Sequence, residues 1–139
     1  EFRAVSERCL VMTDVGSYGV KGRVTDALKT LIDGGAKYDR VFAIGPLIMM
    51  KFVCLLTKEY ALPTVVSMNP IMIDGTGMCG GCRLTVDGKM RFACIDGPDF
   101  DGHLVDFDEM MTRGRTYGDF ERHAYEKTCH LLKAGENHG

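Results

Sequence analysis

Three of the six cysteines in this 139-residue chain lie close together, and their spacing constrains the fold more than any other feature. The segment has the form Asp74-x4-Cys79-x2-Cys82-x11-Cys94 and is rich in glycine between the first two cysteines. Glycines permit positive φ and leave backbone N–H groups free to donate to sulfur. Between Cys82 and Cys94, two short apolar runs flank Asp87-Gly88, a dipeptide typical of a two-residue hairpin turn. Such a hairpin brings the last two sulfurs together, so the segment predicts a metal site.

The fourth ligand of this site is not a cysteine of the same segment. An iron–sulfur cluster held by thiolates needs four ligands, and one known spacing is C-x4-C-x2-C…C. Asp74 occupies the first cysteine position of that spacing, and a carboxylate oxygen can bind iron although it is a harder ligand than sulfur. We favour Asp74 over Cys54 and Cys9, because both cysteines lie in predicted core elements. Cys54 and Cys129 are expected to be ordinary apolar residues.

Structural zinc is the main alternative to an iron–sulfur cluster. Three thiolates, with or without the carboxylate, are a possible zinc site. Zinc sites usually add a second pair of closely spaced ligands, and Cys94 has no Cys or His two or three residues away. The sequence therefore favours iron and sulfide, while zinc and a metal-free loop stay open.

Upstream of the cysteines, predicted strands alternate with predicted helices. Apolar runs at 9–12, 40–44 and 63–67 are typical of buried strands, and the stretches 23–32 and 47–60 of helices. This order predicts an α/β fold with a partial Rossmann-like parallel sheet. Residues 96–102 are expected to form a loop. A helix capped by Asp106 with Glu109 as its capping-box partner, and a second helix over 120–132, are expected to follow. The predicted regions are therefore 1–68, 69–105 and a helical tail over 106–139.

Composition excludes several classes of protein. The net charge is −2, so the chain has no basic excess for binding nucleic acid. The longest apolar runs are too short to span a membrane, and no secretory signal is present. Three of the cysteines are clustered and the others scattered, unlike the pairs of a secreted disulfide framework. Together with the nine methionines, this pattern favours a reducing cytoplasm. Residue 1 is Glu rather than Met, so we expect a processed or shortened chain.

Two groups of residues follow predicted strands and are candidates for nucleotide contact. Asp14, Gly16 and Ser17 follow the first strand, and Gly45, Pro46 and Met49 follow the second. Open α/β sheets bind their ligands at the carboxyl ends of the strands, where a ribose or phosphate could lie. The alternative is structural: the first group is a turn in which an Asp or Ser caps a helix, and the second is a helix start with methionine in the core.

The ordered motifs of the chain also resemble a known family. They are Thr13-Asp-Val-Gly-Ser-Tyr-Gly-Val-Lys-Gly22, Ala43-Ile-Gly-Pro46 with Met49-Met50, Asp74…Met78-Cys-Gly-Gly-Cys82 and Phe92-Ala-Cys-Ile-Asp-Gly-Pro98. The series resembles the C-terminal part of the flavin- and iron–sulfur-containing electron-transfer subunits of the ferredoxin–NADP reductase superfamily. Similar groups are the electron-transfer subunit of dihydroorotate dehydrogenase, sulfide dehydrogenase and hydrogenase gamma-type subunits, and the small subunit of ferredoxin:NADP oxidoreductase.

The resemblance implies an NAD(P)H-dependent oxidoreductase subunit that relays electrons. In the family, a barrel binds FAD, an α/β domain binds NAD(P), and a terminal [2Fe–2S] module passes electrons to a catalytic partner subunit. The resemblance implies that 1–68 is the C-terminal part of the NAD(P)-binding domain. It therefore favours nucleotide contact by the two groups of residues named above over their purely structural roles. Asp74 departs from the four-cysteine dihydroorotate group and resembles the branch in which an aspartate fills the first position.

The chain has no counterpart of the FAD barrel or of the first βαβ unit of the nucleotide domain with its glycine-rich phosphate turn. The resemblance therefore implies the last part of a longer subunit, with FAD and NAD(P) bound by the full-length protein and these residues inactive alone. The competing function is a zinc-stabilised, non-catalytic binding or scaffold module.

Overall fold

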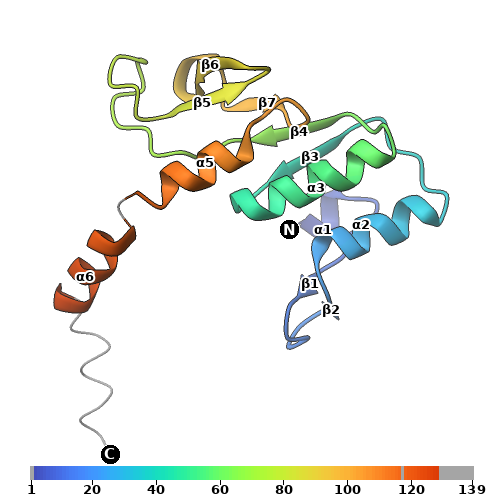
Figure 1. Ribbon diagram of the computed structural model, residues 1–139. Helices are drawn as coiled ribbons and strands as arrows, with labels where there is room; N and C mark the ends of the chain where they lie inside the picture. Colours follow the sequence, from blue (N-terminus) through green and yellow to red (C-terminus); the bar gives the residue numbers. More distant parts are fainter. Residues whose placement is uncertain (1, 117, 129–139) are drawn as a thin grey trace, which may run out of the picture.

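The structure is a computed structural model that describes residues 2–116 and 118–128, and in this part short strands form small sheets flanked by helices (Figure 1). The mixed α/β composition predicted from the sequence is confirmed. In chain order the elements are α1 (Phe2–Val5), β1 (Met12–Thr13), β2 (Val20–Lys21), α2 (Val24–Asp33), β3 (Val41–Ile44), α3 (Leu47–Glu59), β4 (Thr64–Ser67), β5 (Arg83–Val86), β6 (Lys89–Phe92), α4 (Ala93–Asp96), β7 (Asp99–Asp101), α5 (Phe107–Gly114) and α6 (Gly118–Thr128).

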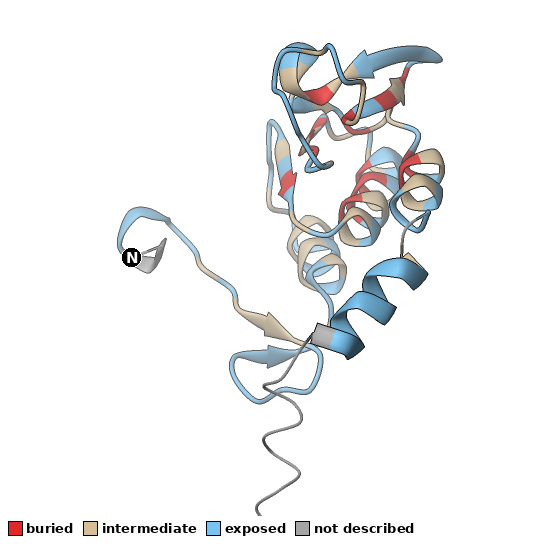
Figure 2. Cartoon of the chain, turned by 90° about the vertical axis from the view of Figure 1, so that its left-hand side faces the viewer, coloured by how far each residue is buried: buried red, intermediate tan, exposed pale blue. Residues whose placement is uncertain are grey.

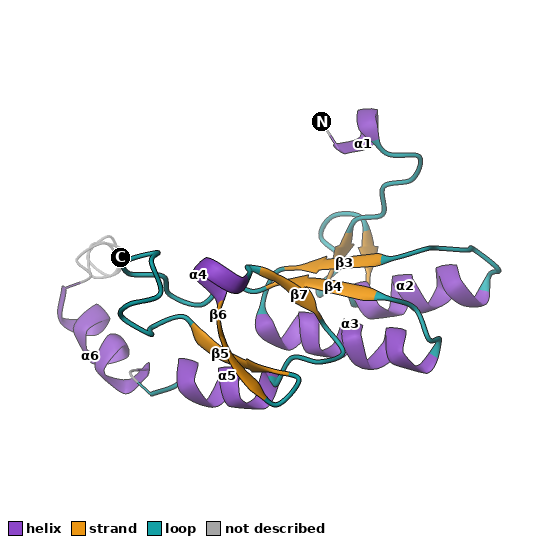
Figure 3. Cartoon of the chain, turned by 90° about the horizontal axis from the view of Figure 1, so that it is seen from above, coloured by secondary structure: helices purple, strands orange, loops and turns teal. Residues whose placement is uncertain are grey.

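A parallel β3–α3–β4 unit forms the centre of the molecule. β3 and β4 pair in parallel over their full length, from Val41 opposite Thr64 to Ile44 opposite Ser67. α3 lies across one face of this pair and buries Met50, which is fully inaccessible to solvent. The strand order is β3-β4-β7, and β7 runs antiparallel to β4 (Figure 3). This unit matches the helix and strands predicted for residues 40–67.

The strand β7 lies where the sequence predicts only a loop. Residues 99–101 read Asp-Phe-Asp, and both aspartates are exposed. They become a strand because the open edge of β4 supplies backbone partners, with Val65 opposite Asp101 and Ser67 opposite Asp99. Three residues are too few for alternating polar and apolar side chains to predict a strand, so only the neighbouring edge reveals it.

The first predicted strand is wrong in both length and pairing. Of residues 9–12 only Met12 is in a strand, and Leu10 is 49% exposed rather than buried. β1 pairs with the short β2 beyond the glycine-rich turn, and not with β3. The hydrogen-bonding groups of this short run are used locally, so the described residues form a parallel unit of two strands instead of the expected three.

One hydrophobic core joins the central unit to the cysteine segment. Its members come from β3, α3, β4, β5, α4 and α5 and from the loops that follow β4 and precede β5 (red in Figure 2). They are Ala43, Met50, Val53, Cys54, Val66, Met68, Cys82, Leu84, Val86, Ala93, Phe107 and Met110. Cys82 therefore lies on an element that is anchored by burial of apolar surface.

The helix that starts after Asp106 is capped as predicted, with one difference. The Asp106 carboxylate accepts the N–H of Glu109 at 2.9 Å. The Glu109 carboxylate does not return this contact but accepts the N–H of Thr85 at 3.0 Å, so the expected capping box is wrong. α6 begins at Gly118, two residues before the predicted start, and residues 129–132 of that prediction lie outside the described part, as does Cys129. No helix within the described ranges is long and apolar enough to cross a membrane.

Candidate metal centre

The loop before the hairpin folds around the carboxylate of Asp74. One carboxylate oxygen accepts the N–H of Thr76 at 2.9 Å, and the other accepts the N–H of Cys79 at 2.7 Å. The Thr76 contact does most to hold the pKa of Asp74 below its ordinary value. Desolvation opposes it, and the contacts from Cys79 and the N–H of Gly77 add to the lowering. Asp74 is therefore an anion at neutral pH, and it lies directly beside Cys79.

The β5–β6 hairpin brings the other two cysteines together. Its two-residue turn places Asp87 at φ 51° and Gly88 at φ 68°, the positive values that an Asp-Gly hairpin turn requires. Cys82 precedes β5 and Cys94 follows β6, and the N–H of Ala93 donates to the carbonyl of Cys82 at 3.2 Å. The two sulfur atoms lie 3.3 Å apart, as the spacing predicts.

The two thiols of this pair differ in acidity. Burial opposes ionisation of Cys82, but hydrogen bonds from the backbone and thiol of Cys94 outweigh it and lower the pKa of Cys82. The pKa of Cys94 is raised, first by its side-chain contact with Cys82 and then by burial.

Cys79 is exposed and its sulfur accepts the N–H of Gly81 at 3.4 Å. The candidate ligands thus lie as two pairs, Asp74 with Cys79 and Cys82 with Cys94. Within the part of the chain that the structure describes, no three His, Cys, Asp or Glu side chains converge closely enough to form a ready-made metal site.

The donors and the surrounding backbone fit an iron–sulfur cluster. Three thiol sulfurs and one anionic oxygen give four ligands, and Gly77 directs its N–H toward Asp74 and Cys94. Gly77 has φ 83°, a left-handed value that favours glycine, and a Cβ there would meet the end of the Ile95 side chain.

The competing cysteine ligands are placed differently. Cys54 lies in α3, is 5% exposed, and burial followed by the charge of Asp101 raises its pKa to about 11. Its sulfur packs against the turn at Gly102, where a Cβ would overlap it. Cys9 is half-buried in the segment before β1. Burial and the raised pKa match the prediction that Cys54 is an apolar core residue.

The first nucleotide candidates lie in the exposed turn between β1 and β2. Asp14, Gly16 and Ser17 are all exposed, and Gly16 has φ 74°. The Thr13 hydroxyl fixes the turn by accepting the N–H of Gly16 at 3.1 Å and donating to the carbonyl of Tyr18 at 2.9 Å. Neither Asp14 nor Ser17 caps a helix, so that alternative is wrong. The N-cap of α2 is instead Arg23, and the carboxylate of Asp26 in the first turn accepts the N–H of Arg23 at 3.0 Å.

The second group lies at the carboxyl end of β3. Gly45 has φ 153°, and Pro46 is the N-cap of α3, with its carbonyl accepting the N–H of Met50 at 3.0 Å. Met49 is half-buried and packs against the core, as its structural alternative predicts. The Asn69 amide reaches the Gly45 carbonyl at 3.5 Å, so this end of β3 adjoins the start of the cysteine segment. The two nucleotide groups lie on different sheets in the described residues.

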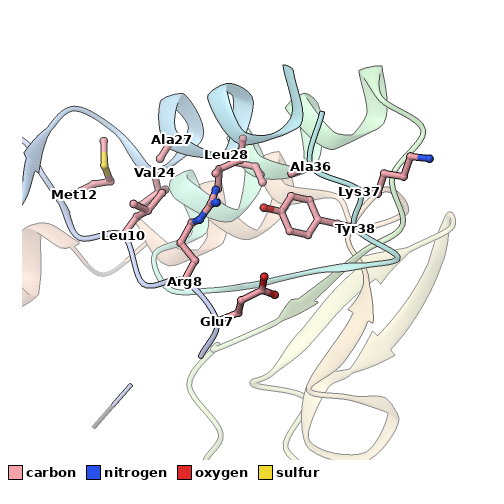
Figure 4. Close-up of a pocket in the computed structure, with 11 residues that line it drawn as sticks. Glu7, Arg8, Leu10, Met12, Val24, Ala27, Leu28, Ala36, Lys37 and Tyr38 are labelled. Carbon is pink, nitrogen blue, oxygen red and sulfur yellow. The ribbon is translucent and has the colours of Figure 1, made fainter. Parts of the chain in front are cut away.

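A cavity of about 610 Å³ lies between the segment before β1 and the apolar face of α2 (Figure 4). Leu10 and Met12 line it on one side and Val24, Ala27 and Leu28 on the other. None of the predicted ligand or nucleotide residues lines this cavity.

Comparison with known proteins identifies the cysteine segment. Residues 69–106 match the iron–sulfur cluster binding domain of dihydroorotate dehydrogenase B. The chain is 50% identical over 137 residues to a Thermotoga maritima protein named as a homologue of the dihydroorotate dehydrogenase B (NAD(+)) electron transfer subunit, covering 99% of this chain and 47% of that protein. It is 38% identical over 126 residues to a protein of Methanocaldococcus jannaschii named as a probable subunit of the same kind, covering 91% and 45%.

A solved structure has the same fold. A chain of the NADH-dependent reduced ferredoxin-NADP oxidoreductase superposes with a TM-score of 0.79 at 50% identity, covering 91% of this chain and 45% of that one. The chain thus spans less than half the length of these relatives. The resemblance inferred from the sequence is confirmed: the chain is related to the electron-transfer subunits of dihydroorotate dehydrogenase B, and residues 69–106 belong to the family of their iron–sulfur cluster binding domains.

Proposed function

We propose that this chain holds a [2Fe–2S] cluster with Asp74 and Cys79 as ligands of one iron and Cys82 and Cys94 as ligands of the other. The observation that carries the proposal is the approach of the Cys82 and Cys94 sulfurs to 3.3 Å at the base of the hairpin. A [2Fe–2S] cluster takes two protein ligands on each iron, which suits an arrangement in two pairs. When bound, the cluster supplies one-electron transfer.

Asp74 has a distinct role in this proposal. Its carboxylate is already anionic and held by two backbone N–H groups, so it needs no proton loss to bind iron. An oxygen ligand is harder than a thiolate and changes the electronic environment of the iron that it binds. Exchange of this one ligand is therefore expected to shift the reduction potential of the cluster.

In the full-length protein, we propose a relay of electrons between NAD(P)H, FAD and a catalytic partner subunit through this cluster. The similarity to electron-transfer subunits supports the proposal. Residues 1–68 would be the C-terminal part of the NAD(P)-binding domain, 69–105 the cluster module and 106–139 a helical tail. The nucleotide would contact Asp14, Gly16 and Ser17 at one strand end and Gly45, Pro46 and Met49 at another. A cytoplasmic location agrees with the unpaired cysteines in the described part.

Metal analysis tests the cluster itself. The full-length protein, purified without oxygen, is expected to contain iron and acid-labile sulfide in equal amounts and to give a rhombic EPR signal on reduction. Stoichiometric zinc without sulfide would instead support the zinc-stabilised module and overturn the redox proposal.

Substitution of Asp74 tests the fourth ligand. Asp74→Cys is expected to keep the cluster and shift its potential, whereas Asp74→Ala is expected to lower the iron and sulfide content. Asp39→Ala is a suitable control, because Asp39 is an exposed aspartate outside the cysteine segment. If Asp74→Ala has the same iron content and EPR signal as the control, Asp74 is not a ligand.

A further inference from the structure

α5 and the residues just before it cover the second edge of β5, the strand that follows Cys82 (Figure 3). β5 pairs with β6 on one side, and on the other side Val86 forms an isolated antiparallel bridge with Val105. On its other side, Thr85 donates its N–H to the Glu109 carboxylate at 3.0 Å and accepts the N–H of Asp106 at 2.9 Å. The start of α5 therefore satisfies backbone groups that a strand edge otherwise leaves open.

Arg113 extends this contact to the backbone around Cys82. It lies one turn after Glu109 on α5, and its guanidinium donates to the carbonyls of Arg83 and Gly81, the latter at 3.4 Å. These two residues are the immediate neighbours of Cys82 in the chain. The Arg113 side chain is 27% exposed and lies 3.9 Å from Glu109, which keeps it on this side of the helix.

The bidentate contact suits arginine and no other side chain. A guanidinium presents several N–H donors in a rigid plane, so one group can bind two carbonyls at once, whereas a lysine ammonium binds as a single point. The bound carbonyls belong to Gly81 and Arg83, and only Cys82 stands between them. Holding both therefore fixes the direction in which the Cys82 side chain leaves the backbone.

We propose that Arg113 is the positioning residue of the cluster site, which holds the backbone on both sides of Cys82 so that its sulfur faces Cys94. The inference rests on the proposed cluster for its functional meaning. Arg113 touches neither the sulfur nor a metal, and it acts only through the peptide groups. The restraint supplements the core packing of Cys82, which is 2% exposed.

The decisive measurement is alkylation of Cys82 in the full-length protein after anaerobic removal of metal with a chelator, followed by peptide mass spectrometry. In Arg113→Met, Cys82 is expected to react on the order of tenfold faster than in the wild type, because lost hydrogen bonds to a charged group favour local opening. Arg113→Lys, which can bind one carbonyl, is expected to lie between the two. Arg115→Met, on the same helix end without a contact to the hairpin, is the matched control. Cys54 is expected to stay unreactive in every variant.

An unchanged rate at Cys82 in Arg113→Met would overturn the proposal. An equal rise at Cys54 would also overturn it, because Arg113 would then stabilise the fold in general. In the metal-loaded protein, Arg113→Met is expected to release iron to a chelator faster and to change the shape of the EPR signal, and Arg115→Met to do neither. Zinc without sulfide in the wild type would refute the proposed function, but the alkylation rates of the metal-free protein would still decide the role of Arg113.

Discussion

The hairpin with α5 and the N-terminal segment that contains β1, β2 and α2 are packed very differently. The hairpin contributes Leu84 and Val86 to the core, and α5 contributes Phe107 and Met110. In α2 no residue is buried, and the turn between β1 and β2 is exposed (Figure 2). Tyr18 in this turn is 63% exposed. The cavity of about 610 Å³ separates α2 from the segment before β1.

This difference in packing indicates that the proposed cluster site depends on the hydrophobic core, whereas the first nucleotide group does not. The proposed cluster ligands Cys82 and Cys94 flank a hairpin that shares its core with β3, α3 and β4. The first group of nucleotide candidates lies in the two-stranded ribbon formed by β1, β2 and the turn between them. This ribbon is held mainly by its own backbone contacts. Regions with few buried apolar contacts open at low free energy, so we expect the ribbon to open without unfolding the hairpin.

The largest effect is expected from truncation of the hairpin core. Leu84 is fully buried, so Leu84→Ala should lower the free energy of unfolding by about 2–5 kcal/mol. Leu10 is 49% exposed in the N-terminal segment, and Leu10→Ala should change it by less than about 0.5 kcal/mol. Urea unfolding of the metal-free protein measures both. Equal losses in the two variants would contradict the contrast between the regions.

A smaller effect is expected in the loop between Asp74 and Cys79. Gly77→Ala places a side chain at φ 83° and against Ile95, which we expect to cost about 1–2 kcal/mol and to reduce the iron content. Gly75→Ala is the control, because Gly75 has φ 74° but open space around it. If both variants lose iron equally, backbone strain and not the contact with Ile95 is responsible.

The helix cap of α5 should contribute less again. Asp106→Ala removes the acceptor for the N–H of Glu109 and should destabilise the protein by about 1 kcal/mol in urea unfolding. Asp108→Ala in the same turn breaks the 2.6 Å ion pair with Lys51. Because the Asp108 side chain is 74% exposed, this substitution should lower the free energy of unfolding by less. The reverse order would mean that the ion pair, and not the cap, fixes α5.

Local signals predicted the features that depend on neighbouring residues alone. Asp87-Gly88 predicted the hairpin turn because both positions must adopt positive φ, and apolar periodicity predicted α2 and α3. The ordered motifs also predicted the family relationship that comparison confirms.

Features that depend on distant partners could not be predicted in this way. β7 needs the edge of β4, and β1 stays short because its partner in the described residues is β2. Glu109 matched the capping-box pattern in sequence, but its carboxylate instead accepts the N–H of Thr85 on β5. No local pattern in the sequence predicts the role of Arg113, because it donates to two carbonyls about thirty residues away in the chain.

The smallest global effect is expected from a substitution that damages the ribbon itself. A Cβ at Gly19, which has φ 75°, would overlap the carbonyl of Val11, so Gly19→Ala must displace the backbone that joins β1 to β2. Hydrogen exchange at Val20 and Gly22, whose N–H groups donate to Val11 and Thr13 at 2.8 and 3.1 Å, should therefore become faster. The free energy of unfolding should fall by no more than the small free energy that opens the β1–β2 segment alone, and the iron content should not change, because no core residue moves. A loss of iron in this variant would show that the ribbon and the hairpin are coupled, and the two regions would then have to be treated as one cooperative unit.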